Sequence, residues 1–186
     1  MDEVINVDIK GIEIKLKTKP GVFSKNGIDN GSKLLIENVE IKDGDLIADL
    51  GAGTGIVGFV AAKQNYNGHV HLLEDHIRSV ELAVENVELN KLKNVEVFLS
   101  DLFSAVGERT YHLILSNPPQ QMGNQFLEES AVQCLKHLKP KGEVYWVVQK
   151  HVRPVIERYF NQVFGNCEII ARGKDHVVLR AQNTTP

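Results

Sequence analysis

Three glycines in the run Asp49-Leu-Gly-Ala-Gly-Thr-Gly55 form the segment best suited to holding a small ligand. An apolar run precedes them and a helical pattern follows, which places them in a turn between a strand and a helix. Glycine lets the backbone approach a ligand without a β-carbon in the way, and the first N–H groups of a helix attract an anionic group. Although a plain turn is the alternative, we expect a carboxylate or phosphate against Gly51, Ala52, Gly53, Thr54 and Gly55.

The spacing of these glycines favours one kind of ligand over another. They follow G-x-G-x-G, whereas dinucleotide sites use G-x-G-x-x-G, and an acidic residue, Asp49, precedes them. An acid at this place would repel a pyrophosphate, but it suits a ligand that carries an amino-acid zwitterion.

Further acidic residues follow the next two apolar runs. Glu74 and Asp75 end the second run, where a carboxylate can accept from both ribose hydroxyls, and Glu74 is preferred because it directly ends the run. After the third run, Asp101 is placed to hold an adenine amino group and Leu102 to pack on the ring. A single acid is more often a cap or turn residue, but acids after three successive strands predict S-adenosylmethionine as the ligand.

The run Ser116-Asn-Pro-Pro119 follows a fourth apolar run and is the candidate catalytic segment. Asn-Pro alone marks a turn. Here Pro118 and Pro119 restrict the backbone, so the Asn117 side chain and the Pro118 carbonyl can both accept hydrogen bonds from a planar NH2 group. Two such hydrogen bonds orient an exocyclic amine so that its lone pair faces a methyl donor. Catalysis then rests on position and fixed dipoles, and we expect no essential general base.

The elements around these segments alternate between strands and helices. Continuous apolar strands between helices predict a parallel sheet covered on both faces. The predicted strands are 46–50, 70–74, 95–99, 112–116 and 144–148, and the predicted helices are 56–64, 77–89, 126–138 and 152–164.

The two ends of the chain follow different patterns. Segments 167–171 and 177–181 are too close for a parallel crossover, so they predict an antiparallel hairpin at the sheet edge. Near the N-terminus, alternating apolar residues on both sides of Lys10-Gly11 predict another hairpin, and a short helix is expected over 34–38. We therefore divide the chain into a prelude, 1–45, packed on the same domain, and a cofactor-binding core, 46–186.

Composition limits the possible classes of protein. The chain has 186 residues with 42% hydrophobic and 24% charged residues, which fits one folded domain. No apolar run approaches the ~18 residues of a membrane span, and the first residues are acidic, so we expect a cytoplasmic protein. The seven histidines show no H-x-x-x-H or H-E-x-x-H spacing, and we predict no metal site.

Charge is distributed unevenly along the chain. Residues 46–135 hold 5 Lys and Arg against 11 Asp and Glu, whereas residues 136–186 hold 9 against 4. A solvated surface is the simpler interpretation of the basic part. The alternative is that it attracts an anionic partner such as RNA.

Several segments together resemble the catalytic domain of the small-subunit-type ribosomal RNA guanine-N2 methyltransferases. They are Gly21-Val-Phe-Ser24, Asp29-x-Gly-Ser32, Asp49-Leu-Gly-x-Gly53, Ser100-Asp-Leu-Phe-Ser104, Ser116-Asn-Pro-Pro119 with Gly123, and His137-Leu-Lys-Pro-Lys-Gly142. The resemblance implies a Rossmann-like class I methyltransferase fold, with a seven-stranded, mostly parallel sheet and an antiparallel C-terminal edge strand. It also implies S-adenosylmethionine as methyl donor and Asn117, Pro118 and Pro119 at the target amine, guanine N2 before adenine. Asn117 is expected among the cofactor-binding residues as well.

Two departures from that family affect the substrate. Gln120 stands where the family has an aromatic residue that stacks on the flipped base, which leaves Phe23 as a candidate for stacking. Larger members also carry a second, noncatalytic half that helps to hold RNA; we expect no such half in a chain of this length, and we expect a monomer or a homodimer. The alternatives are methylation of a protein glutamine and a noncatalytic cofactor-binding subunit of an RNA-modifying complex.

Overall fold

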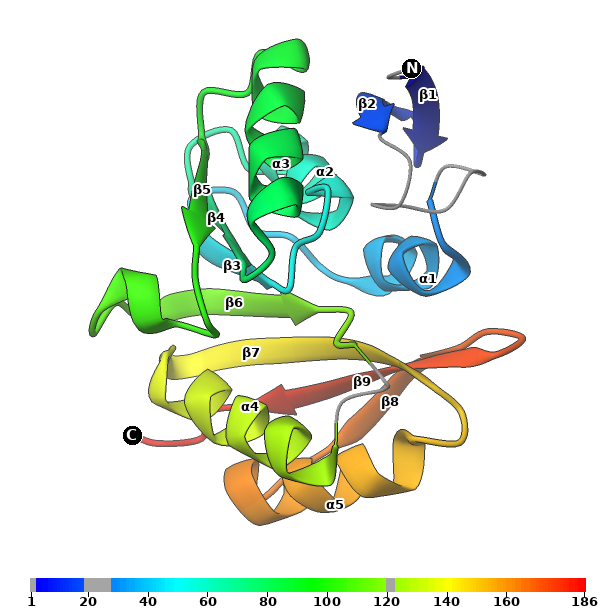
Figure 1. Ribbon diagram of the computed structural model, residues 1–186. Helices are drawn as coiled ribbons and strands as arrows, with labels where there is room; N and C mark the ends of the chain where they lie inside the picture. Colours follow the sequence, from blue (N-terminus) through cyan, green and yellow to red (C-terminus); the bar gives the residue numbers. More distant parts are fainter. Residues whose placement is uncertain (1–2, 19–27, 120–122) are drawn as a thin grey trace.

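The computed structural model describes residues 3–18, 28–119 and 123–186 (Figure 1). Its strands are β1 Glu3–Ile9, β2 Ile12–Thr18, β3 Leu46–Leu50, β4 His69–Glu74, β5 Val95–Leu99, β6 Tyr111–Ser116, β7 Leu138–Gln149, β8 Glu168–Arg172 and β9 His176–Gln182. Its helices are α1 Asn30–Asn38, α2 Ile56–Gln64, α3 Ile77–Leu89, α4 Asn124–Lys136 and α5 Arg153–Phe164, with a 3-10 turn at Ser104–Val106.

Seven strands form one sheet in the order β5-β4-β3-β6-β7-β9-β8. The pairs among β5, β4, β3, β6 and β7 are parallel, and β9 pairs antiparallel with both β7 and β8. The predicted Rossmann-like methyltransferase fold, its antiparallel edge and its N-terminal hairpin are confirmed. The strand order adds that β9 lies between β7 and β8.

Helices cover both faces of this sheet (Figure 1). One apolar cluster joins α1 and α2 to the face formed by residues such as Ile47, Leu72 and Leu115. A second cluster joins α4 and α5 to the other face, around Trp146. Two-sided burial explains why the strands read as continuous apolar runs.

Several element boundaries differ from those expected. Helix α1 begins at Asn30 because the Asp29 carboxylate accepts a hydrogen bond from Ser32 N at 2.9 Å and caps the helix. Strand β7 begins at Leu138, which pairs with Tyr111, and then shifts register before Glu143 pairs with Leu113. The register shift contains Pro140 and a Lys141 with φ of 64°, features that interrupt an apolar pattern.

Two asparagines, Asn86 on α3 and Asn90 at the C-cap of that helix, attach the N-terminal hairpin to the main domain. Asn86 accepts from Lys17 N at 2.7 Å and donates to Lys17 O at 3.2 Å, while Asn90 makes the same pair of bonds with Lys15 at 2.9 and 2.7 Å. The side-chain amides thereby replace the backbone partners that a neighbouring strand would supply to β2. Figure 1 shows the hairpin beside α2 and α3.

Among the described residues, no helix combines the length and the apolar character needed to cross a membrane.

Replacing Asn86 with Ala should lower the free energy of unfolding by about 2 kcal/mol, because Asn86 is fully buried and its loss removes two hydrogen bonds with the Lys17 backbone. Asn90→Ala removes an equivalent but exposed pair and should cost less than ~1 kcal/mol. Urea denaturation of both variants measures the difference. Equal losses would contradict a role for burial.

Candidate functional site

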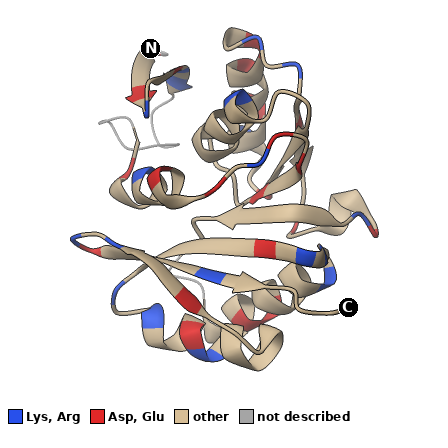
Figure 2. Ribbon diagram, turned by 180° about the vertical axis from the view of Figure 1, so that it is seen from behind, with Lys and Arg blue, Asp and Glu red and all other residues tan. Residues whose placement is uncertain are grey.

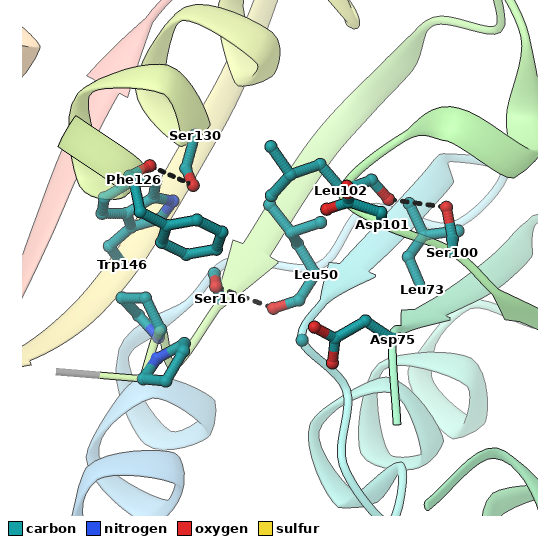
Figure 3. A pocket seen from close by; sticks show the side chains of 13 residues that line it. Leu50, Leu73, Asp75, Ser100, Asp101, Leu102, Ser116, Phe126, Ser130 and Trp146 are labelled. Carbon is teal, nitrogen blue, oxygen red and sulfur yellow. Dashed lines mark hydrogen bonds between the residues drawn. The ribbon is translucent and has the colours of Figure 1, made fainter. Parts of the chain in front are cut away.

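The carboxyl ends of β3, β4, β5 and β6 meet at one edge of the sheet and surround a pocket (Figure 3). About 460 Å³ of space in and around it is free of protein atoms, part of which is open to solvent. The lining residues are Leu50, Gly51, Leu73, Asp75, Ser100, Asp101, Leu102, Ser116, Pro118, Pro119, Phe126, Ser130 and Trp146.

The glycine loop after β3 lies over the end of β4. Gly51 N and Ala52 N both donate to Leu73 O, at 2.8 and 3.2 Å. Gly51, Gly53 and Gly55 all have positive φ. At Gly55, with φ of 93°, a β-carbon would also clash with the Phe59 ring and lie 2.9 Å from Leu72 Cδ1. Glycine at position 55 therefore permits both the turn and the close packing of α2 against the sheet.

The start of α2 has polar groups that are available to a ligand. The N-cap residue Gly55 makes no side-chain cap, Gly58 N in the first turn donates to Asp49 Oδ2, and the buried Thr54 hydroxyl has no hydrogen-bond partner among the described residues. The remaining backbone N–H groups at the start of a helix favour an anion such as a carboxylate.

Asp49 lies beneath the glycine loop instead of in the pocket wall. Its side chain is 2% exposed, and Oδ2 accepts from Gly58 N at 2.8 Å. Burial raises the pKa of Asp49 to about 7, opposed by the Gly58 hydrogen bond and assisted by the nearby Glu74 carboxylate. The structure thus shows Asp49 supporting the loop, and a direct contact with the cofactor stays a prediction.

The two acids after β4 have different surroundings. Glu74 is buried, and its oxygens accept from Gly53 N at 2.7 Å and from His76 N at 2.9 Å. Burial also raises the pKa of Glu74. Asp75 is exposed and lines the pocket. Glu74 therefore holds the loop in place, while Asp75 has its carboxylate at the pocket, and the choice between them as ribose ligands stays open.

The turn after β5 presents Asp101 and Leu102 to the pocket (Figure 3). Leu102 has a φ of 48°, a left-handed conformation that is strained for leucine. Ser100 Oγ stabilises the turn by donating to Leu102 O at 2.8 Å and accepting from Ala105 N at 3.1 Å. The predicted adenine residues are thus adjacent on one wall.

Hydrogen bonds made by Ser116 and by the Asn117 side chain fix the position of the segment that follows β6. Ser116 Oγ donates to Leu50 O at 2.7 Å and joins the segment to β3. Asn117 Nδ2 lies 3.2 Å from Asp29 Oδ1 and 3.1 Å from Ser32 Oγ, while Pro118 and Pro119 line the pocket. The structure therefore brings the predicted catalytic segment to the pocket that Asp75, Asp101 and Leu102 also line.

Three residues opposite this wall were not expected from the sequence. Phe126 and Ser130 come from α4 and Trp146 comes from β7 (Figure 3). Ser130 Oγ donates to Phe126 O at 2.7 Å, within the helix. The available signal was topological, because α4 follows the catalytic segment directly and its first turns must lie near that segment. Phe23 and Gln120, the predicted substrate residues, lie outside the described residues.

One group of side chains that could hold a metal ion was not predicted from the sequence, because only wider histidine spacings were considered. It consists of His69, His71 and Glu96. Their nitrogen and oxygen atoms lie within 4.8 Å of one another on β4 and β5. His71 Nδ1 is 3.0 Å from the Tyr111 hydroxyl, and its ring packs edge-on against Phe98. The group belongs to the packing between strands and begins at the end of β4 opposite the pocket.

The described residues fit S-adenosylmethionine. Asp75 and Asp101 supply carboxylate acceptors for hydroxyl and amino groups. Leu50, Leu73 and Leu102 supply apolar surface for a ring. The Thr54 hydroxyl, which has no hydrogen-bond partner among the described residues, and the first N–H groups of α2 that Asp49 does not bind complete a set that suits the nucleoside and the carboxylate of this cofactor.

Comparison with known proteins gives a family match over most of the chain. The methyltransferase small domain family matches residues 13–180. The uncharacterized protein YbxB of Bacillus subtilis is 34% identical over 167 residues, covering 87% of this chain and 82% of that protein. The ribosomal RNA small subunit methyltransferase C of Vibrio cholerae is 30% identical over 182 residues, covering 95% of this chain and 52% of that protein.

A solved structure agrees with these matches. The T. thermophilus 16S rRNA N2 G1207 methyltransferase RsmC, in complex with AdoMet and guanosine, superposes with a TM-score of 0.83 at 25% identity. The match covers 97% of this chain and 50% of that one. The chain thus spans about half the length of the ribosomal RNA methyltransferases that it matches.

Asp49→Asn should remove a pH dependence of stability. Folding raises the pKa of Asp49 from 3.8 to about 7. Between these values the folded state binds a proton that the unfolded state has lost, so this carboxyl lowers stability as pH rises from 4 to 7. Asparagine keeps an acceptor for Gly58 N without the charge. In urea unfolding, the variant should gain stability relative to the wild type from pH 4.5 to 7.5. A constant difference would contradict the raised pKa.

Proposed function

The chain belongs to the methyltransferase small domain family and is an S-adenosylmethionine-dependent methyltransferase domain, and we propose that it methylates an exocyclic base amine in RNA. Guanine N2 in ribosomal or transfer RNA is the first choice of target. When bound, the cofactor supplies an electrophilic methyl group on its sulfonium.

The orientation of Asn117 is the observation that carries this proposal. Because a carboxylate oxygen only accepts, the atom facing Asp29 Oδ1 must be the amide nitrogen. The amide oxygen therefore lies on the other side of Cγ and remains an acceptor. Pro118, which follows directly, has a carbonyl and no N–H. Two acceptors side by side suit a donor with two N–H bonds, which is what a base amine offers.

These residues perform the reaction by positioning. The lone pair of an exocyclic amine is delocalised into the base and is a poor nucleophile. Accepting both N–H bonds at Asn117 Oδ1 and Pro118 O turns the amine so that its lone pair faces the methyl carbon. The bound cofactor would supply the methyl group and leave as a neutral thioether, and the extra proton on nitrogen would then pass to water. Fixed acceptors supply the stabilisation without a general base.

Basic residues at the same edge of the sheet support an RNA substrate. Strand β7 ends there and β9 begins there, since Gln149 pairs with His176. Lys150, Arg153, Arg172 and Lys174 lie in the segments at this edge. Figure 2 shows Lys and Arg at the tip of the β8–β9 hairpin and in the connection from β7 to α5, with acidic residues among them.

Transfer of labelled methyl from S-adenosylmethionine to unmodified ribosomal RNA, followed by nucleoside analysis, tests this function. N2-methylguanosine is expected. Asn117→Ala should slow transfer by at least about a hundredfold, since it removes one of two acceptors, while cofactor affinity stays within about threefold. Label in protein glutamine and not in RNA would overturn the RNA substrate. A large loss of cofactor affinity would mean that Asn117 holds the cofactor instead of the amine.

The basic edge should determine the salt dependence of RNA binding. Replacing Lys150, Arg172 and Lys174 together with Ala should weaken binding and reduce the slope of log K against log salt by about 2, because each contact to single-stranded RNA contributes ~0.7.

A matched control is the triple Ala variant of Lys136, Lys139 and Lys141. These residues lie where α4 ends and β7 begins, at the opposite edge of the sheet, and their removal should leave RNA affinity within about twofold of the wild type. Equal effects of the two variants, measured by fluorescence anisotropy, would show that net charge alone governs binding.

A further inference from the structure

The segment Asp29-Asn-Gly-Ser32 stood out in the sequence, and the proposed function uses it only to identify which atom of the Asn117 amide is the nitrogen. It lies at the start of α1, 85 to 88 positions before Asn117 in the chain. The structure nevertheless brings it into direct contact with the Asn117 side chain. No other hydrogen bond of the Asn117 amide group is observed among the described residues.

The Asp29 contact determines which way the Asn117 amide faces. Nδ2 donates to Asp29 Oδ1 at 3.2 Å and to Ser32 Oγ at 3.1 Å. The carboxylate has no hydrogen to donate, so a flipped amide would place two oxygens against each other. Asp29 therefore selects one orientation of the amide plane, and the Ser32 hydroxyl, which can donate or accept, adds a second hydrogen bond to that orientation.

The two acceptors are themselves fixed by the helix. Asp29 Oδ1 also accepts from Ser32 N at 2.9 Å, and Asp29 O accepts from Lys33 N at 3.0 Å. Ser32 is 5% exposed. These bonds leave the acceptor side of the contact little freedom to move.

Gly31 makes this arrangement possible. A β-carbon at Gly31 would lie 3.0 Å from Asp29 Oδ1 and 3.1 Å from His176 Cδ2. Glycine thus leaves room for the carboxylate on one side and for the β8–β9 hairpin on the other. Asp29, Gly31 and Ser32 have complementary roles in one contact.

We infer that Asp29 and Ser32 are positioning residues that hold Asn117 Oδ1 toward the substrate amine. The inference rests on the proposed function of Asn117 as an amine acceptor. Without these bonds, the amide plane rotates, and its nitrogen competes with its oxygen for the place facing the amine. Turnover should therefore fall while cofactor binding, which uses other residues, is preserved.

Two variants separate this role from helix capping. Ser32→Ala removes the hydroxyl acceptor and keeps the backbone N–H that Asp29 caps. Asp29→Ser keeps a good N-cap residue, but its side chain is too short to reach Asn117. Each should lower kcat about five- to tenfold, with the KM for S-adenosylmethionine within twofold and Tm within a few degrees of the wild type. Asp29→Asn retains an oxygen for both bonds and should restore kcat to within about threefold.

NMR of the side-chain amides provides a readout that does not depend on activity. The Asn117 NH2 signals are identified as those missing from Asn117→Ala. They should shift in Ser32→Ala and in Asp29→Ser. Glu37→Gln, on the exposed side of the same helix, should leave both these signals and kcat unchanged.

The outcomes distinguish this inference from the proposed function. Unshifted NH2 signals, or shifted signals with unchanged kcat, would overturn the positioning role. A parallel rise in the KM for S-adenosylmethionine with a fall in Tm would also overturn it, because it would show general damage. A wild-type protein that methylates protein and not RNA would refute the proposed substrate, and the same comparison of kcat would then be made with the protein substrate.

Discussion

The parallel alignment of β3, β4, β5 and β6 is the constraint on which the site depends. Because their carboxyl ends share one edge, four loops that are distant in the chain must converge there. Ser116 Oγ to Leu50 O, Gly51 N to Leu73 O and Ser100 N to Glu74 O then join neighbouring loops across that edge. The pocket is therefore a consequence of sheet topology, and local sequence decides only which side chains enter it.

The sequence predicted the elements that build this edge with good accuracy, because two-sided burial leaves an unambiguous apolar run in each central strand. Strands 46–50 and 95–99 and helices 56–64 and 77–89 have the expected bounds. The predicted element boundaries were wrong where a side-chain cap or strand pairing overrides the local apolar pattern. The Asp29 cap starts α1 early, and pairing of Leu138 with Tyr111 extends β7. The place of β9 between β7 and β8 depends on long-range pairing that no local pattern encodes.

Within the site, residue type was predictable but orientation was not. The sequence shows acids at the ends of β3, β4 and β5. Whether such a carboxylate faces a ligand or a backbone N–H depends on the loop above it. Asp49 and Glu74 are buried against Gly58 N and Gly53 N, whereas Asp75 lines the pocket. Phe126 and Trp146 reach the pocket from α4 and β7, and the packing of the whole fold determines where these two elements lie. The contact between Asn117 and Asp29 joins segments that only the complete fold brings together.

Burial of these acids also explains how an acidic centre is compatible with the proposed polyanionic substrate. Asp49 and Glu74 lie beneath the loop, and burial raises the pKa of both carboxyls. For Asp49 the pKa is about 7, which reduces the average negative charge that this carboxyl carries at neutral pH. The cofactor brings a cationic sulfonium and an ammonium group, which favour ionised carboxylates at short range. Exposed charges act over a Debye length of ~8–10 Å, and at the same edge of the sheet as the pocket these include Lys150, Arg172 and Lys174. An approaching phosphate backbone therefore meets the basic edge, while the negative charge stays close to the cofactor.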